Sequence, residues 1–254
     1  LISLCASLLG VSLVLKRYSM IGDGLSHVSF GALSVAVAFG WAPLAVSIPV
    51  VAAAAVLLLR ITGNGKIKSD AAIAMISAGS LAVGIIVTSL TTGMTTDVSS
   101  YMFGSILAMS REDVVLSAVL SLIVLGMFIL CYNKGFAVTF DESFAKATGV
   151  NVSLYNVLIA VLIAITIVIG MRMMGAMLIS SLIIFPALTS MRVFKSFRGV
   201  VIASGILSLI CFFGGMVMSY TYSTPAGASV VVVDLAAFLL FSLIQRGIAA
   251  TARK

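Results

Sequence analysis

The sequence is poor in charge. Of its 254 residues only 9% are Asp, Glu, Lys or Arg, whereas 61% are hydrophobic. A soluble domain typically has about 25% charged and about 45–50% apolar residues. More than half of any folded surface is already apolar, so a soluble fold of this size could not hide so much apolar surface. The composition therefore argues against a cytosolic enzyme, a nucleic-acid-binding domain or a disulfide scaffold, and it indicates an integral membrane protein.

Cysteine and histidine are also scarce. Cys5, Cys131 and Cys211 lie far apart in apolar runs and form no CxxC pair, which indicates apolar packing residues rather than disulfides. The single histidine, His27, has no partnered metal motif or nucleophile, so an intramembrane enzyme is a poor interpretation. The sequence also lacks G-x-x-x-x-G-K-[ST], the loop that binds nucleotide phosphates. If ATP drives this protein, another chain must bind the ATP.

Long apolar runs predict the fold class, because a membrane-spanning helix needs about 20 mostly apolar residues. We expect an all-α integral membrane protein in which residues 1–254 form a single transmembrane domain, a bundle of eight or nine spanning helices with a short cytoplasmic helix. The first run is short and the chain opens on Leu, so we expect a few residues upstream rather than a signal peptide. The runs are Leu1–Leu15, Met20–Phe39, Leu44–Leu59, Ala71–Leu90, Val114–Cys131, Leu154–Gly170, Gly175–Met191, Val200–Tyr220 and Ala226–Ile244.

Lysine and arginine occur mainly in alternate connections between these runs. If the N-terminus lies outside, thirteen of the 15 basic residues fall on the cytoplasmic side, and Arg111 and Arg172 stay outside. Such an excess is typical of cytoplasmic loops, so the net charge of +7 reflects topology and lipid surroundings rather than nucleic acid. The sequence predicts a multi-pass protein with its N-terminus outside and its C-terminus inside. The thirteen are Lys16, Arg17, Arg60, Lys66, Lys68, Lys134, Lys146, Arg192, Lys195, Arg198, Arg246, Arg253 and Lys254.

Two connections are longer than a turn requires. The outer connection, Thr91–Asp113, contains an amphipathic stretch beginning at Asp97 that is too short to span, so we expect a surface or re-entrant helix there. The inner connection contains Asp141–Gly149, in which Phe140 or Asp141 could cap a helix start and Gly149 stands where a helix ends. A short capped helix outside the membrane suggests a docking element.

Ionisable residues inside spans are costly and therefore candidates for function. Asp23 and His27 are four residues apart, which places both side chains on one helix face about one turn apart. A carboxylate and an imidazole suit a borderline cation such as Zn²⁺ or Mn²⁺. A hydrogen-bonded pair that only joins two helices would show the same spacing. Asp234, the other acid deep in a span, could line the pathway and contact metal, or could be a protonated or serine-paired structural residue.

Five short motifs in this order resemble the membrane permease subunits of bacterial zinc and manganese ATP-binding-cassette importers. The resemblance runs over essentially the whole chain, and its most specific segment is Gly22-Asp-Gly-Leu-Ser-His27, similar to the family's G-D-[AS]-L-[AS]-H. Gly24 departs from that pattern, which should loosen the helix beside the acid, and Asp234 stands where relatives should be apolar. The other motifs are Tyr101-Met-Phe-Gly104, Thr139-Phe-Asp-Glu142 with Ala145 and Gly149, Gly175-Ala-Met-Leu-Ile-Ser-Ser-Leu182 with Pro186-Ala187, and Thr224-Pro-Ala-Gly227.

The resemblance implies partners and residue roles. It implies a second permease copy, cytoplasmic ATP-binding subunits and an extracytoplasmic solute-binding protein, all at the bacterial cytoplasmic membrane. Asp23 and His27 would contact the transported ion, Zn²⁺ or Mn²⁺, with ATP on the partner subunit and no cofactor bound covalently to this chain. The coupling helix that fits the ATPase would comprise Asp141, Glu142, Ser143, Phe144, Ala145, Lys146, Ala147, Thr148 and Gly149.

The sequence thus favours inward transport of Zn²⁺, with Mn²⁺ next, by a transport subunit that is not itself an enzyme. Because imidazole must be deprotonated to bind metal, uptake should fall at acidic pH. Two alternatives stay open. One is an importer permease for chelated iron or a corrinoid, which would need a wide cavity, and the other is an ion-coupled secondary transporter, which would need no ATPase partner.

Overall fold

The computed structural model describes residues 1–63, 69–92 and 111–251. In these ranges all regular secondary structure is helical, as the sequence predicts. The helices are α1 (Ile2–Leu15), α2 (Ile21–Ala38), α3 (Pro43–Gly63), α4 (Ser69–Thr92), α6 (Arg111–Leu130), α7 (Tyr132–Phe140), α8 (Glu142–Ala147), α9 (Val152–Met174), α10 (Ala176–Val193), α11 (Phe197–Tyr222) and α12 (Ala226–Thr251).

Eight of these helices are long and apolar enough to cross a membrane, and α1, with 14 residues, is shorter. Each of the nine predicted apolar runs lies on one of these nine helices, which confirms the expected bundle of eight or nine spans. Helices suit this setting because they satisfy their own backbone hydrogen bonds where lipid offers none. Polar side chains mark several helix starts, and the Asn151 and Ser196 oxygens accept bonds from the backbone N–H groups of Leu154 and Gly199.

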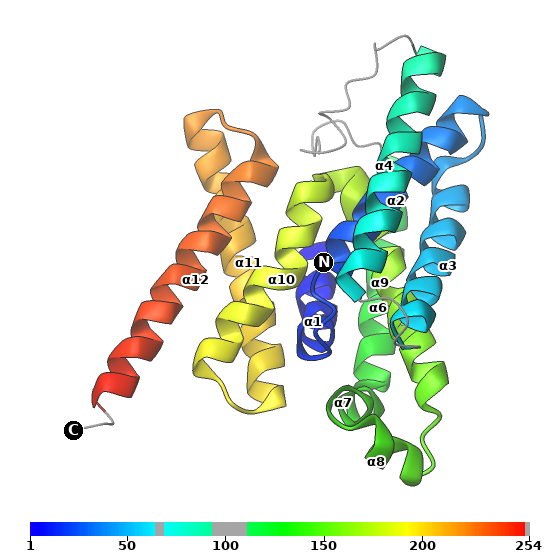
Figure 1. The fold of residues 1–254 in the computed structure, drawn as a ribbon. Coiled ribbons are helices and arrows are strands. Elements are labelled where there is room, and N and C mark those ends of the chain that lie inside the picture. The colour runs from blue at the N-terminus through cyan, green and yellow to red at the C-terminus, as the bar shows by residue number, and fades with distance from the viewer. Residues whose placement is uncertain (64–68, 93–110, 252–254) are drawn as a thin grey trace.

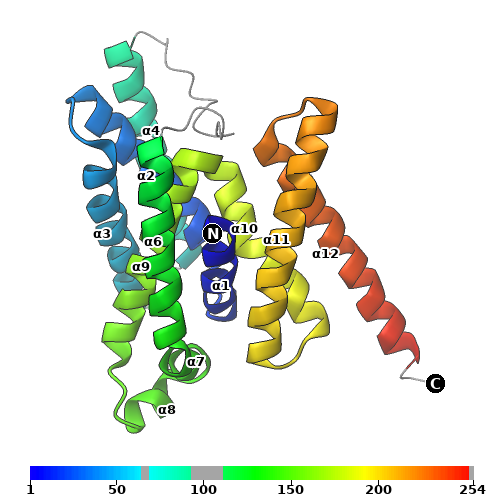
Figure 2. The same ribbon diagram turned by 180° about the vertical axis from the view of Figure 1, so that it is seen from behind.

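Helices α1 and α10 occupy the middle of the bundle. Both views of the ribbon show α11 and α12 at one edge and α3 and α4 at the other (Figures 1 and 2). Helix α10 packs against α1, α2, α9, α11 and α12, so it contacts both sides of the bundle. Its Leu178, Ile179, Leu182 and Ile183 are almost fully buried in the main core. A movement of α10 therefore changes its packing against helices on both sides of the bundle.

Small residues join α1 to its neighbours. Gly10 of α1 touches the backbone of Ile183 in α10 so closely that a Cβ at position 10 would overlap it. Helix α1 is also joined to α11 by hydrogen bonds. The Ser208 hydroxyl of α11 donates to the Ser3 carbonyl of α1 at 2.9 Å, and the Ser204 hydroxyl donates to the Ser7 carbonyl at 3.2 Å. Small residues and interhelical hydroxyl bonds are how helices associate in lipid. Helix α1 is thereby fixed firmly against both α10 and α11.

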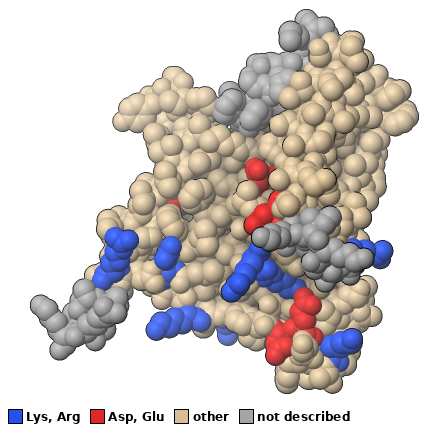
Figure 3. Space-filling view, in the orientation of Figure 1, with Lys and Arg blue, Asp and Glu red and all other residues tan. Residues whose placement is uncertain are grey.

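The two ends of the bundle differ in charge. Helices α7 and α8, the α10–α11 connection and the end of α12 share one end, lowest in Figure 1, which we call the α8 end. The α2–α3 and α11–α12 connections lie at the opposite end. On the face drawn in Figure 3, the described Lys and Arg side chains gather in the lower half, toward the α8 end. This distribution follows the charge asymmetry of the sequence.

Candidate functional site

Asp23 and His27 lie on the first turns of α2, as their spacing predicts. His27 Nε2 is 3.8 Å from Asp23 Oδ2. The side chain of Asp23 is 46% exposed and that of His27 is 19% exposed. All other residues from position 21 to position 33 are buried. The carboxylate and imidazole therefore share the one part of this helix segment that the bundle leaves open.

Helix α10 provides a neighbour for the acid. The Ser180 hydroxyl lies 3.4 Å from Asp23 Oδ1, a long hydrogen bond, and it also donates to the Ala176 carbonyl at 3.0 Å. The Ser26 hydroxyl, three residues after Asp23 on α2, donates instead to the Asp23 backbone carbonyl at 2.7 Å. Asp23 Oδ2 and the His27 ring are thus the groups best placed to meet an ion from the open side.

Gly24 explains how α2 and α4 approach each other beside this pair. A Cβ at position 24 would lie 2.7 Å from Ile73 Cγ2 of α4, closer than side chains tolerate. Helix α2 runs unbroken through this position from Ile21 to Ala38. The departure from the expected Ala or Ser therefore accommodates Ile73 in a continuous helix.

Two side chains do not make a complete metal cage. A structural zinc site has four ligands, and catalytic zinc has three from the protein. In the part of the chain that the structure describes, His, Cys, Asp and Glu form no group of three or more that could hold a metal. The Asp23–His27 pair therefore offers two candidate ligands rather than a complete metal site.

Asp234 lies apart from this pair. It is 1% exposed on α12, against the Cys211 thiol of α11 and the Ser181 hydroxyl of α10. Its Oδ2 has no hydrogen-bond partner among the described residues. Ser180 and Ser181 follow each other on α10, and one faces Asp23 whereas the other faces Asp234. The structure does not bring the three sequence-predicted ionisable residues together.

Helix α8 matches the predicted capped helix. Asp141, not Phe140, is the N-cap, and its Oδ1 accepts from Phe144 N at 2.9 Å. At the other end Gly149 has φ +84°, a left-handed conformation that glycine adopts without strain. Val150 N then donates to the Ala145 carbonyl at 3.0 Å, which closes a Schellman-type cap.

The surface of α8 is open. From residue 141 to residue 149 only Ala145 is buried, so Ala145 faces the bundle while the rest of the predicted coupling segment is accessible. Phe144 is 62% exposed although it is large and apolar. Helix α8 therefore presents an accessible surface that carries an aromatic side chain.

Sequence reasoning missed α7, which precedes α8. Its Phe136 ring lies 4.9 Å from that of Phe197 at the start of α11, and its Tyr132 ring lies 5.5 Å from the same ring. Because Phe197 is distant in sequence, no local pattern indicated this aromatic cluster. The predicted outer helix beginning at Asp97 and the motif Tyr101–Gly104 lie outside the described residues.

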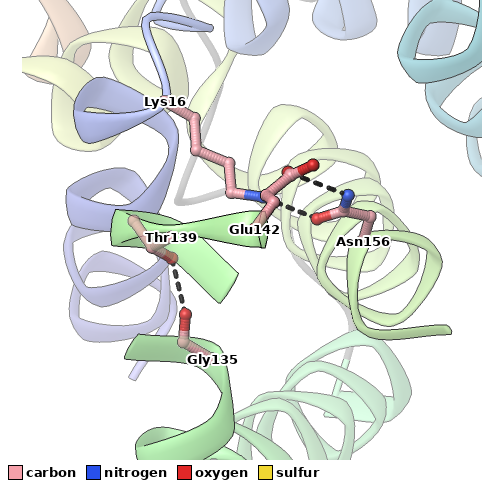
Figure 4. Close-up of polar contacts among 5 residues, drawn as sticks. All are labelled: Lys16, Gly135, Thr139, Glu142 and Asn156. Carbon is pink, nitrogen blue, oxygen red and sulfur yellow. Dashed lines mark hydrogen bonds and ion pairs between the residues drawn. The ribbon is translucent and has the colours of Figure 1, made fainter. Parts of the chain in front are cut away.

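A second feature that the sequence did not reveal is a polar contact that joins α8 to the end of α1 and to α9 (Figure 4). Lys16, the C-cap residue that follows α1, donates to Glu142 Oε1 at 2.8 Å and to Asn156 Oδ1 at 2.6 Å. Asn156 Nδ2 also donates to Glu142 Oε1, at 3.2 Å. Partial burial raises the pKa of Glu142, but the hydrogen bonds from Lys16 and Asn156 and the charge of Lys16 together lower it below its ordinary value.

Comparison with known proteins identifies the family. The model of the ABC 3 transport family matches residues 1–245. The chain belongs to the ABC 3 transport family. This membership confirms the family resemblance and the expectation of a transport subunit rather than an enzyme.

Relatives of this chain carry both metal names. The high-affinity zinc uptake system membrane protein ZnuB of Haemophilus influenzae is 27% identical over 245 residues, covering 96% of this chain and 94% of ZnuB. The manganese import system permease protein ScaB of Streptococcus gordonii is 28% identical over 239 residues, covering 94% of this chain and 86% of ScaB. Among solved structures, PsaBC from Streptococcus pneumoniae in complex with Fab has a TM-score of 0.85 at 28% identity, covering 94% of this chain and 86% of the other.

Proposed function

We propose that this chain is the membrane subunit of an ATP-driven importer that moves a divalent transition metal ion into the bacterial cytoplasm, Zn²⁺ by preference and Mn²⁺ next. The observation that carries the proposal is that Asp23 and His27 lie together on the part of α2 that the bundle leaves open. The names of the zinc and manganese relatives support the class of cargo.

The chemistry of the pair suits transport. Carboxylate oxygen and neutral imidazole nitrogen are ligands for borderline divalent cations. An ion that crosses must be bound well enough to enter and weakly enough to leave. Asp23 and His27 would replace part of the hydration shell of the ion during passage, and two ligands from one chain would still permit its release.

A second copy of the chain would complete the pathway. Asp23 keeps nearly half of its side chain exposed in the single chain, which leaves room for a partner on that side. A dimer around a shared axis would present two carboxylates and two imidazoles to the ion. Asp234 is enclosed by α10, α11 and α12, so we assign the ion contact to Asp23 and His27 and a packing role to Asp234.

The energy would come from ATP bound by a separate cytoplasmic subunit that docks on α8. The open surface of α8 and its exposed Phe144 support this proposal. The gathering of basic residues toward the α8 end supports a cytoplasmic location for that end. The N-terminus then lies outside, and an extracytoplasmic binding protein would deliver the ion to the opposite end.

The test is ATP hydrolysis and metal uptake by the complex with its ATP-binding subunit and binding protein, reconstituted in liposomes. Zinc and manganese are compared at equal free concentration. We expect zinc to stimulate both activities more strongly than manganese. Stimulation by neither ion contradicts the proposal, and uptake that continues without the ATPase would indicate a secondary transporter. A response only to chelated iron or a corrinoid would indicate the other permease class.

A further inference from the structure

Helix α8 is held to the bundle by few side chains. Only Ala145 of its residues is buried, and the helix itself has just six residues. A force applied to α8 can reach the spanning helices only through the groups that join them. The side-chain hydrogen bonds that join α8 to α1 and α9 in the described structure converge on Glu142, the first residue of α8.

The contact at Glu142 joins three elements. Lys16 comes from the end of α1, Glu142 from α8 and Asn156 from the first turns of α9 (Figure 4). The side chain of Lys16 is only 11% exposed, although that of Glu142 is 54% exposed. An exposed pair between flexible side chains contributes little, but a largely buried lysine with two oxygen partners is held in one geometry. The contact therefore constrains the direction of α8 relative to both spans.

Helix α1 connects this contact to the metal-pathway residues. Six residues before Lys16, Gly10 lies against the backbone of Ile183 in α10. The Ile183 side chain in turn packs against Gly22 of α2, where a Cβ would lie 3.2 Å from Ile183 Cδ1. Ser180, one turn earlier on α10, approaches Asp23. If α8 displaces α1, the displacement is therefore transmitted to α10 and α2 through direct helix–helix contacts, with no loop in between.

We propose that Lys16 is a positioning residue that transmits movement of α8 to α1 through Glu142 and, with Asn156, keeps α8 in register with α9. This inference rests on the proposed function, in which an ATPase subunit moves α8. Without Lys16 the ATPase can still dock on the exposed surface of α8 and hydrolyse ATP. Less of the resulting motion then reaches α10 and α2, so fewer ions cross for each ATP consumed.

The experiment measures metal ions imported per ATP hydrolysed by the reconstituted complex. The variants are Lys16→Met, Glu142→Gln, their double variant, and Lys16→Glu combined with Glu142→Lys. The matched control is Lys134→Met, which removes a lysine of α7 at the same end, one that lies over the Tyr155 ring and outside the contact. The amount of assembled complex and its thermal midpoint are recorded for each variant.

We expect Lys16→Met to lower the ratio by about threefold or more, within the range of about 2- to 30-fold for residues that carry coupling. ATP hydrolysis should continue, and Lys134→Met should keep the wild-type ratio. The double variant should be no worse than the poorer single variant, because the residues act as a pair. The charge reversal should recover part of the ratio, because it restores an ion pair between positions 16 and 142, and the recorded thermal midpoints separate this effect from a change in stability.

An unchanged ratio in an assembled Lys16→Met complex would overturn the inference, as would a fall only in thermal midpoint. If Lys16→Met fails to assemble, Asn156→Leu and the charge-reversed variant give the same comparison. Failure of the proposed function looks different, because the wild-type complex itself would then show no metal-stimulated ATP hydrolysis. That result would overturn both statements, whereas normal wild-type coupling with a normal variant ratio overturns only the role of Lys16.

Discussion

Asp23 and Asp234 are associated with successive serines of one helix. Ser180 of α10 approaches Asp23 at 3.4 Å, and Ser181 contacts Asp234. One acid is open on α2 and the other is enclosed on α12. Both residues are acids within predicted spans, but their surroundings differ, so their substitution should have different consequences.

Asp234→Asn should preserve metal uptake per assembled complex within about twofold, because an amide can keep contacts with Cys211 and Ser181. Asp234→Leu should lower the thermal midpoint, since the larger leucine side chain must fit into a site that is only 1% exposed. Uptake assays normalised to assembled complex, with thermal unfolding in detergent, measure both effects. A large loss of uptake in a stable Asp234→Asn complex would instead place Asp234 in the pathway.

Gly10→Ala should destabilise the protein by about 1–3 kcal/mol, because the added methyl group must separate the backbones of α1 and α10. The matched control is Gly126→Ala on α6, where an added Cβ meets nothing within 4 Å. That change should be neutral or stabilise by about 0.5–1 kcal/mol, as alanine favours helix. Equal thermal midpoints for the two variants would contradict the close contact.

Phe144→Ala should weaken association with the ATP-binding subunit by about tenfold, since truncation of an aromatic side chain that anchors an interface costs more than about 1 kcal/mol. Phe213→Ala is the control because Phe213 is similarly exposed, 64% against 62%, but lies on the spanning helix α11. Affinity for the purified ATPase subunit is measured by titration in detergent. Equal affinities of the two variants for the ATPase subunit would show that Phe144 of α8 does not contribute to the interface.

The Lys16–Glu142 contact should keep its contribution to stability down to acidic pH. The pKa of Glu142 is lower in the folded protein than its unfolded value of about 4.3. The contribution is therefore complete above the unfolded pKa and is lost as pH falls through the folded pKa. The difference in thermal midpoint between wild type and Glu142→Gln should stay constant from pH 8 to about pH 5 and shrink below about pH 4. A difference that shrinks between pH 7 and pH 6 would contradict this pKa direction.

Local features of the sequence predicted much of this molecule. Apolar runs located the spanning helices, because the need to bury apolar side chains in lipid acts along continuous segments. The four-residue spacing placed Asp23 and His27 on one face, and local capping groups at Asp141 and Gly149 identified α8. Each of these signals lies within one helix or at its ends.

Long-range contacts could not be predicted in the same way. Lys16 and Glu142 are 126 residues apart, and nothing beside either one indicates the other. Helix α7 has only nine residues and contacts Phe197 more than 50 positions away, so its stability comes from tertiary packing rather than from local propensity. The enclosure of Asp234 likewise depends on three helices meeting, which its own apolar span does not reveal.

The initial rate of zinc uptake by Asp23→Asn and His27→Gln complexes tests the central claim most directly. The variants replace the carboxylate of Asp23 and the imidazole of His27 with neutral amides, which are weaker ligands for Zn²⁺, and Ser34→Ala on the same helix serves as control. We expect each variant to lose uptake by about tenfold or more at equal assembly, and the control to match wild type. Wild-type rates for both Asp23→Asn and His27→Gln would contradict the assignment of this pair to the ion pathway.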